Sequence, residues 1–140
     1  MIAISACLLG ENCKYNGGNN LRKELLKLDN VISICPEMLG GLGCPRYPSE
    51  IVKDKVINIK GEDVTEYFKK GALIALEKCK DNNVKLVILK AYSPSCGCNK
   101  IYDGTFTSTL INGDGIFVRL LKENGINYID DISYLKKEKD

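Results

Sequence analysis

Three of the seven cysteines lie where short apolar runs end, and they are the residues most able to do chemistry. Cys7, Cys35 and Cys96 each come at or just after a run of aliphatic and β-branched side chains. Three thiolates could bind zinc if a fourth cysteine completed the site. They could also hold an iron–sulfur cluster with one open iron. The spacing matches neither paired zinc-ribbon cysteines nor a compact ferredoxin run. The alternative is that these thiols are small buried side chains, as free cysteines commonly are.

The chain contains no histidine. This excludes Ser–His and Cys–His catalytic pairs and mixed Cys/His zinc sites, so a general base has to be Asp, Glu, Lys, Tyr or Cys. Glu37 is the candidate base because it closely follows Cys35 in the sequence, where burial and cluster charge would tune its pKa. The alternative is a surface glutamate that caps its own loop.

Two serines and an arginine are candidate substrate-binding or assisting residues. Ser93 and Ser95 precede Cys96, and their hydroxyls could bond to cluster sulfurs, to a substrate carbonyl or to the backbone of the turn. Arg46 lies in the Pro/Gly-rich segment after Cys35 and could bind an anion or form a structural ion pair. We assign Ser95 and Arg46 to substrate binding.

The four other cysteines carry weaker signals. Cys79 lies on the apolar face of a predicted helix, so we expect it in the core. Cys13, Cys44 and Cys98 lie in segments close to the three strand-end cysteines, and we assign them no role. Each is either near the site through its loop or a spare thiol.

Apolar runs, typical of strands, and amphipathic segments, typical of helices, alternate along the chain. These elements have to position the side chains described above. Strands are predicted over 2–7, 31–35, 86–92 and 126–129, a hairpin over 51–60, and helices over 21–28, 63–81 and 113–124. Residues 36–48 are expected to form an irregular loop, and a polar tail ends the chain. This order predicts a single α/β domain over residues 1–140, with a mainly parallel sheet flanked by helices in a Rossmann-like three-layer arrangement. Ligands of such sheets bind outside the carboxyl ends of the strands, where the three thiols converge if their strands are neighbours.

Composition is that of an ordinary globular protein, with 44% hydrophobic and 27% charged residues, a net charge of +2 and a pI of about 8.1. This balance does not indicate a dedicated nucleic-acid binder, so we expect no DNA partner. No apolar run approaches the roughly 20 residues of a membrane span, and no signal peptide is evident. We therefore expect a cytoplasmic protein that does not bind membranes.

Three sequence blocks carry a family resemblance: SACLLG around Cys7, CPEMLGGLGCPR around Cys35, and SPSCG followed by YDGTF around Cys96. In order, they resemble the signatures of the thiouracil desulfidase family. The resemblance implies a [4Fe–4S] cluster held by Cys7, Cys35 and Cys96, with the fourth iron free for substrate sulfur. It also implies that Glu37 is the acid/base and Ser93 the assisting serine. The chain departs from the pattern at Asn16, where members often have Asp, and in its extra cysteines.

The function that follows is non-redox desulfuration of thiouracil or thiouridine to uracil or uridine plus sulfide. A small-molecule thiolated pyrimidine is the expected substrate, and thiolated RNA stays open. The alternative is a non-catalytic metal or iron–sulfur binding or sensor module whose site is completed by another cysteine. We expect the cluster to be lost when the protein is handled in air.

Overall fold

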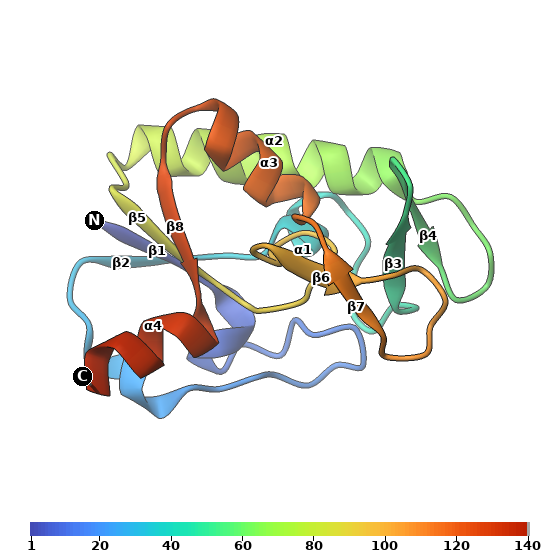
Figure 1. Ribbon diagram of the computed structural model, residues 1–140. Helices are drawn as coiled ribbons and strands as arrows, with labels where there is room; N and C mark the ends of the chain where they lie inside the picture. The colour runs from blue at the N-terminus through green and yellow to red at the C-terminus, as the bar shows by residue number, and fades with distance from the viewer. Residues whose placement is uncertain (140) are drawn as a thin grey trace.

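The computed structural model describes residues 1–139, which fold around a four-stranded parallel sheet. The strands are ordered β2-β1-β5-β8, with bounds β2 Val31–Ile34, β1 Ile2–Ser5, β5 Leu86–Leu89 and β8 Asn127–Asp130. The chain thus starts in the middle of the sheet, and each later strand is added beside β1 or β5 (Figure 1).

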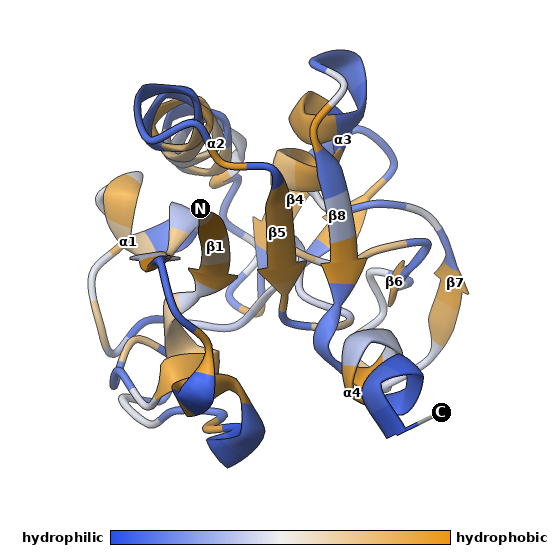
Figure 2. Cartoon of the chain, turned by 90° about the vertical axis from the view of Figure 1, so that its left-hand side faces the viewer, coloured by the Kyte–Doolittle hydropathy of each residue, from blue (hydrophilic) through white to orange (hydrophobic). Residues whose placement is uncertain are grey.

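The two central strands consist of aliphatic residues because both of their faces are covered. Ala3 and Val87 belong to one buried cluster, and Ile4 and Ile88 belong to another on the opposite face. Figure 2 shows β1 and β5 as hydrophobic ribbons at the centre of the molecule. The predicted α/β class with a parallel sheet flanked by helices is confirmed.

Two layers cover this sheet (Figure 1). One contains α2 (Thr65–Asp81) and α3 (Ile116–Glu123), which bury Phe68 and Phe117 against the sheet, and the short α1 (Pro36–Leu39) packs on α2. The other contains the 3-10 segments Ala6–Leu9 and Lys23–Lys27 and helix α4 (Asp131–Lys139). Among residues 1–139, no helix combines the length and the apolar character that crossing a bilayer requires.

Two antiparallel hairpins extend from this frame. Strands β3 (Ser49–Val52) and β4 (Lys55–Asn58) form the first, close to the predicted range 51–60. Strands β6 (Lys100–Tyr102) and β7 (Leu110–Asn112) form the second, which the sequence analysis did not predict. Its strands have three residues each and β7 is exposed along its length, so neither shows a clear alternating pattern.

Several predicted boundaries were wrong. The first strand ends at Ser5 and Cys7 lies in a 3-10 turn, while the strand expected over 86–92 ends at Leu89. The helix expected over 21–28 is a 3-10 segment, and the helix expected from residue 113 begins at Ile116. The expected loop after Cys35 starts with the helical turn α1, because Pro36 suits a first helical position.

The expected polar tail was also wrong, because residues Asp131–Lys139 form helix α4. Tyr134 and Leu135 pack on the cluster that contains Ile4, so the tail buries an apolar edge despite its lysines.

Candidate active site

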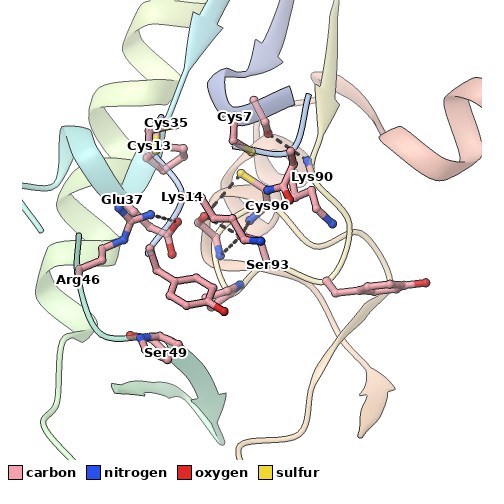
Figure 3. A pocket seen from close by; sticks show the side chains of 18 of the residues that line it. Cys7, Cys13, Lys14, Cys35, Glu37, Arg46, Ser49, Lys90, Ser93 and Cys96 are labelled. Atoms are coloured by element: carbon pink, nitrogen blue, oxygen red, sulfur yellow. Dashed lines mark hydrogen bonds and ion pairs between the residues drawn. The ribbon is translucent and has the colours of Figure 1, made fainter. Parts of the chain in front are cut away.

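A cavity of about 410 Å³ lies at the carboxyl ends of β1, β2 and β5. Its wall includes Cys7, Cys13, Cys35 and Cys96, together with Glu37. Figure 3 shows the cysteines gathered at one end of this pocket, with Glu37 and Arg46 on one side and Lys90 on the other. The crevice predicted at the carboxyl ends of the parallel strands is therefore present.

The parallel register brings the three strand-end cysteines together. Strand β1 pairs with β2 on one side and β5 on the other, and Ser5 is opposite Ile34. Cys7 follows β1 in a 3-10 turn, and Cys35 is the N-cap residue of α1 directly after β2. Cys96 lies in the loop after β5.

The loop that carries Cys96 is fixed by its own serine. The Ser93 hydroxyl oxygen accepts hydrogen bonds from the backbone N–H groups of Ser95 (3.1 Å) and Cys96 (3.0 Å). The Gly97 N–H donates to the Ser93 carbonyl at 2.8 Å, which closes the turn. Since the Ser93 oxygen already accepts two bonds and the Ser95 hydroxyl donates to the Cys96 sulfur, the Ser93 O–H donates to the Ser95 oxygen at 3.0 Å.

Helix α3 holds the same loop from behind. The backbone N–H groups of Ile116 and Phe117 donate to the carbonyls of Pro94 and Ser95, both at 2.9 Å. A Cβ atom at Gly115 would overlap the Ser95 peptide, so glycine is required for this close approach. The start of α3 thereby satisfies its own N–H groups and locks the cysteine loop.

Burial raises the pKa of the Cys96 thiol, and hydrogen bonds from Ser95 and Ser5 oppose this rise. The Ser95 hydroxyl lies 3.5 Å from the Cys96 sulfur. A buried thiol with hydroxyl donors gives up its proton readily only when a cation binds the sulfur. This environment therefore suits a metal ligand better than a free nucleophile.

Cys13, to which the sequence analysis assigned no role, lines the same cavity as the three strand-end cysteines. Figure 3 shows its side chain beside that of Cys35. The Cys13 hydrogen bond is the largest influence on both neighbours: it lowers the pKa of Cys7 to about 7 and also lowers the pKa of Cys35. The same contacts and burial raise the pKa of Cys13 itself.

The remaining cysteines do not appear in the cavity wall as described over residues 1–139. The Cys44 thiol donates to the carbonyls of Asn12 (3.2 Å) and Lys14 (3.1 Å), on either side of Cys13. Cys98 is buried behind the loop, with its sulfur 3.6 Å from the Cys96 carbonyl. Cys79 is fully buried on α2, and its predicted place in the core is confirmed.

Glu37 is not a surface loop cap. Its side chain is 18% exposed, and its Oε2 accepts a hydrogen bond from Arg46 Nη2 at 3.0 Å (Figure 3). Burial raises the pKa of Glu37, and the Arg46 guanidinium offsets part of that rise. Arg46 itself is 8% exposed and also donates to the Gly43 carbonyl at 2.9 Å.

Helix packing places Glu37 and Cys35. A Cβ atom at Gly71 of α2 would overlap the Pro36 carbonyl oxygen, and one at Gly40 would overlap the Tyr67 carbonyl oxygen. The backbones of α1 and α2 therefore touch directly at these two positions. Glycine is needed at both because a side chain would overlap the backbone of the other helix. This contact fixes the segment between the cysteine and the carboxylate.

The cavity lining is also aromatic and partly basic. Lys14 and Lys90 line it, with ammonium groups 5.7 Å and 5.8 Å from the ring centroids of Tyr15 and Tyr92. The aromatic lining residues are Tyr15, Tyr47, Tyr92, Tyr102 and Phe106. Such a wall is suited to a planar ring.

Glu50 shapes this wall. It is buried, and its Oε1 accepts hydrogen bonds from the backbone N–H groups of Gly104 (3.0 Å) and Phe106 (3.1 Å). Phe106 has a φ of 58°, in the left-handed region that non-glycine residues rarely adopt. The buried carboxylate thus holds a strained turn in place against the cavity.

The comparisons with known proteins agree with this geometry. The model of the 2-thiouracil desulfurase family matches residues 2–132. The chain belongs to this family. An uncharacterized protein of Bacillus subtilis (strain 168), YbbK, is 40% identical over 144 residues, covering 94% of this chain and 95% of its own length. A solved structure named as the [4Fe-4S]-dependent thiouracil desulfidase TudS superposes with a TM-score of 0.90 and 35% identity, covering 96% of this chain and 93% of that one.

These findings confirm the predicted family and, with it, an enzyme rather than a structural module. The predicted cofactor is the one that the name of the solved relative contains. The roles of individual residues in this chain remain predictions.

The donor set of this desulfurase-family chain fits an iron–sulfur cluster. Cys7, Cys35 and Cys96 supply sulfur from three neighbouring strand ends to one cavity. Within residues 1–139, no group of three or more His, Cys, Asp or Glu side chains is arranged to hold a metal ion. The ligands of a [4Fe–4S] cluster bind different irons, so they do not have to converge on one point.

Sequence reasoning missed three functional or positioning residues: Cys13, Glu50 and Asp131. Asp131 is fully buried, and its carboxylate accepts from the Ala91 N–H and from Arg22 Nε, both at 2.9 Å. Asp131 thereby links the segment after β5 to the start of the 3-10 segment Lys23–Lys27. None of these residues belongs to the three sequence blocks that carry the family resemblance. Each acts through a contact with a distant segment, so no local pattern in the sequence identifies it.

Proposed function

We propose that this protein desulfurates a small thiolated pyrimidine, thiouracil or thiouridine, by hydrolysis at a [4Fe–4S] cluster held by Cys7, Cys35 and Cys96. One observation carries the proposal: a partly buried carboxylate, Glu37, lines the same cavity as the three strand-end cysteines. Membership in the 2-thiouracil desulfurase family supports the substrate class.

When bound, the cluster would supply one iron without a cysteine ligand, a soft Lewis acid suited to sulfur. The chain itself supplies the base. Among the described residues, none donates a hydrogen bond to Glu37 Oε1, which leaves this oxygen for a water molecule. Glu37 removes a proton from that water, whose oxygen adds to the carbon that bears the sulfur. Overall, a C=S group and water become a C=O group and hydrogen sulfide.

Arg46 and Ser93 assist in different ways. Arg46 offsets part of the rise in the Glu37 pKa that burial causes, and so favours the ionised form that a base requires. Its contact with Glu37 favours a positioning role over the direct substrate contact predicted from sequence. The Ser93 O–H, which bonds to the Ser95 oxygen in this structure, turns to the substrate ring and gives it a proton or a hydrogen bond as charge develops. Ser95, whose hydroxyl lies 3.0 Å from that of Ser93, continues this polar edge toward Cys96.

The aromatic lining supports a planar substrate, and the cavity volume of about 410 Å³ supports a small one. Five aromatic side chains line the cavity, so a pyrimidine ring can stack there. The proposal includes a cytoplasmic location, supported by seven free cysteines, which persist in a reducing compartment.

The test is substrate-dependent release of sulfide by protein purified and reconstituted without oxygen. We expect wild type to convert 2-thiouracil or 4-thiouridine to the oxo compound with one sulfide per turnover. Glu37→Gln should retain iron and lose turnover by about 100-fold or more. Iron without sulfide release from the free base, the nucleoside or thiolated RNA would favour the sensor alternative. Release only from RNA would overturn the small-molecule assignment.

A further inference from the structure

Two aromatic side chains of the cavity are carried on strained backbone. Tyr92 has a φ of 70° and Phe106 a φ of 58°, in the left-handed region that bulky residues rarely adopt. Backbone strain of this kind is concentrated at functional sites and persists where surrounding contacts enforce it. Among residues 1–139, the remaining non-glycine residues with a positive φ, none of them aromatic, are Asn30, Lys53, Asn83, Asn99 and Ser108.

The segment that carries Tyr92 is enforced by contacts with three other parts of the fold. The Lys90 N–H donates to the hydroxyl of Ser5, at the end of β1, at 3.0 Å. The Ala91 N–H donates to the buried Asp131 carboxylate at 2.9 Å. Tyr92 itself forms an isolated parallel bridge to strand β6. These contacts hold the backbone in the conformation that Tyr92 would otherwise avoid.

The ring of Tyr92 is held as well as its backbone. It meets the Tyr102 ring edge to face, with centroids 6.1 Å apart and planes at 60°. The Lys90 ammonium lies over the Tyr92 ring, 5.8 Å from its centroid, and donates to the Ala91 carbonyl at 3.1 Å. Both kinds of contact stabilise an aromatic ring in one orientation.

The position of Tyr92 in the chain connects this ring to the proposed chemistry. Tyr92 directly precedes Ser93, the proposed donor to the substrate, and both line the cavity that contains the strand-end cysteines. Tyr15 and Tyr47 line it too, but they are 41% and 53% exposed, so their rings are less restrained. A ring that is already ordered loses little side-chain freedom when it binds a ligand.

We propose that Tyr92 is the side chain on which the pyrimidine ring of the substrate stacks, and that its strained backbone directs this ring into the cavity. The inference rests on the proposed function, because it requires a planar substrate bound beside Ser93. It assigns the recognition of a flat ring to one of the five aromatic lining residues.

Stacking acts on substrate and product alike, because the thiolated and the oxo pyrimidine are both flat. Loss of the Tyr92 ring should therefore raise KM for the substrate and the inhibition constant of the product together, and leave kcat nearly unchanged. Removing an aromatic partner from a stacked base weakens binding by about 5- to 150-fold. A dihydro substrate has a saturated, puckered ring and should gain little from Tyr92.

The experiment compares wild type, Tyr92→Phe, Tyr92→Leu and Tyr92→Gly, each reconstituted without oxygen. Kinetics are measured with 2-thiouracil or 4-thiouridine, whichever wild type converts faster, with its dihydro form, and with its oxo product as inhibitor. The control is Tyr67→Leu, at a tyrosine of α2 that is 48% exposed.

We expect Tyr92→Leu to raise KM and the product inhibition constant at least about tenfold with kcat near that of wild type. It should also lose most of the preference of wild type for the planar substrate over its dihydro form. Tyr92→Phe keeps the ring and should match wild type, as should Tyr67→Leu. Tyr92→Gly adopts a positive φ without strain, so it should fold and hold iron while its KM matches that of Tyr92→Leu.

Three outcomes overturn the inference and leave the proposed function standing. Equal KM values in wild type and Tyr92→Leu would show that the ring does not bind the substrate. A lower kcat and iron content with unchanged KM, in both Tyr92→Leu and Tyr92→Gly, would make Tyr92 a structural residue. A KM in Tyr92→Phe as high as in Tyr92→Leu would assign binding to the hydroxyl. Wild type that releases no sulfide from thiouracil or thiouridine would instead remove the proposed function together with this inference.

Discussion

Gly71→Ala tests how the fold positions the site, because this glycine is where α2 meets α1. The added methyl group would overlap the carbonyl oxygen of Pro36, and it would lie 2.9 Å from the Gly40 backbone nitrogen. Both neighbours are backbone atoms, so no side chain can rotate away. The two helices therefore have to separate.

Two opposing effects set the size of the change. Replacing glycine by alanine within a helix gains about 1 kcal/mol from helix propensity. Overpacking a close contact costs about 1–3 kcal/mol, and here the upper part of that range applies because only backbone movement relieves the overlap. We expect the free energy of unfolding to fall by about 1–2 kcal/mol. Since Pro36 separates Cys35 from Glu37, turnover should fall with it.

The assay is urea unfolding together with iron content and kcat. Lys70→Ala, at an exposed position of the same helix, is the control and should change stability by less than about 0.5 kcal/mol. If Gly71→Ala were more stable than wild type by about the propensity value, with normal kcat, the close contact would not position the site.

Three further variants test single contacts. In Arg46→Met, the pKa of Glu37 should rise; because the ionised form is the base, the acid limb of kcat/KM should move up by about 1–3 pH units, and an unchanged limb would refute the pairing. Glu50→Gln should raise KM about tenfold with little change in kcat by loosening Phe106; equal KM values would refute this role. Asp131→Asn should lower the free energy of unfolding by about 1.5–3 kcal/mol, and an unshifted urea midpoint would contradict it.

The sheet and the convergence of three cysteines were predictable because each depends on local patterns. Apolar runs identify β1, β2 and β5, and their parallel direction, though not their order in the sheet, follows from the alternation of strands and helices. Cys7, Cys35 and Cys96 come at or shortly after the ends of those runs, so one physical rule places all three at one edge.

Cys13 and the β6–β7 hairpin were not predictable for the opposite reason. Cys13 lies in a turn-rich loop, and its place is set by Cys44, a residue 31 positions later by number, through bonds to the backbone on either side of Cys13. The hairpin depends on the Glu50 carboxylate holding the turn at Phe106, another distant contact. Neither contact leaves a periodic signal.

Helix α4 shows the same limit at the end of the chain. Its sequence is rich in lysine, and its apolar contribution comes from Tyr134 and Leu135, which pack beneath the sheet. A polar segment with three apolar residues, of which only Tyr134 and Leu135 pack on the core cluster, is interpreted as a tail until the tertiary contact is known.

Iron and acid-labile sulfide per chain, measured after anaerobic purification, test the central claim most directly. The variants are Cys7→Ser, Cys35→Ser and Cys96→Ser, with Cys79→Ser as the control that changes a core thiol. The account predicts about four irons and four sulfides in wild type and in the control, and loss of the cluster in each of the three site variants. Full iron content in any one of those three variants would contradict the proposed ligand set.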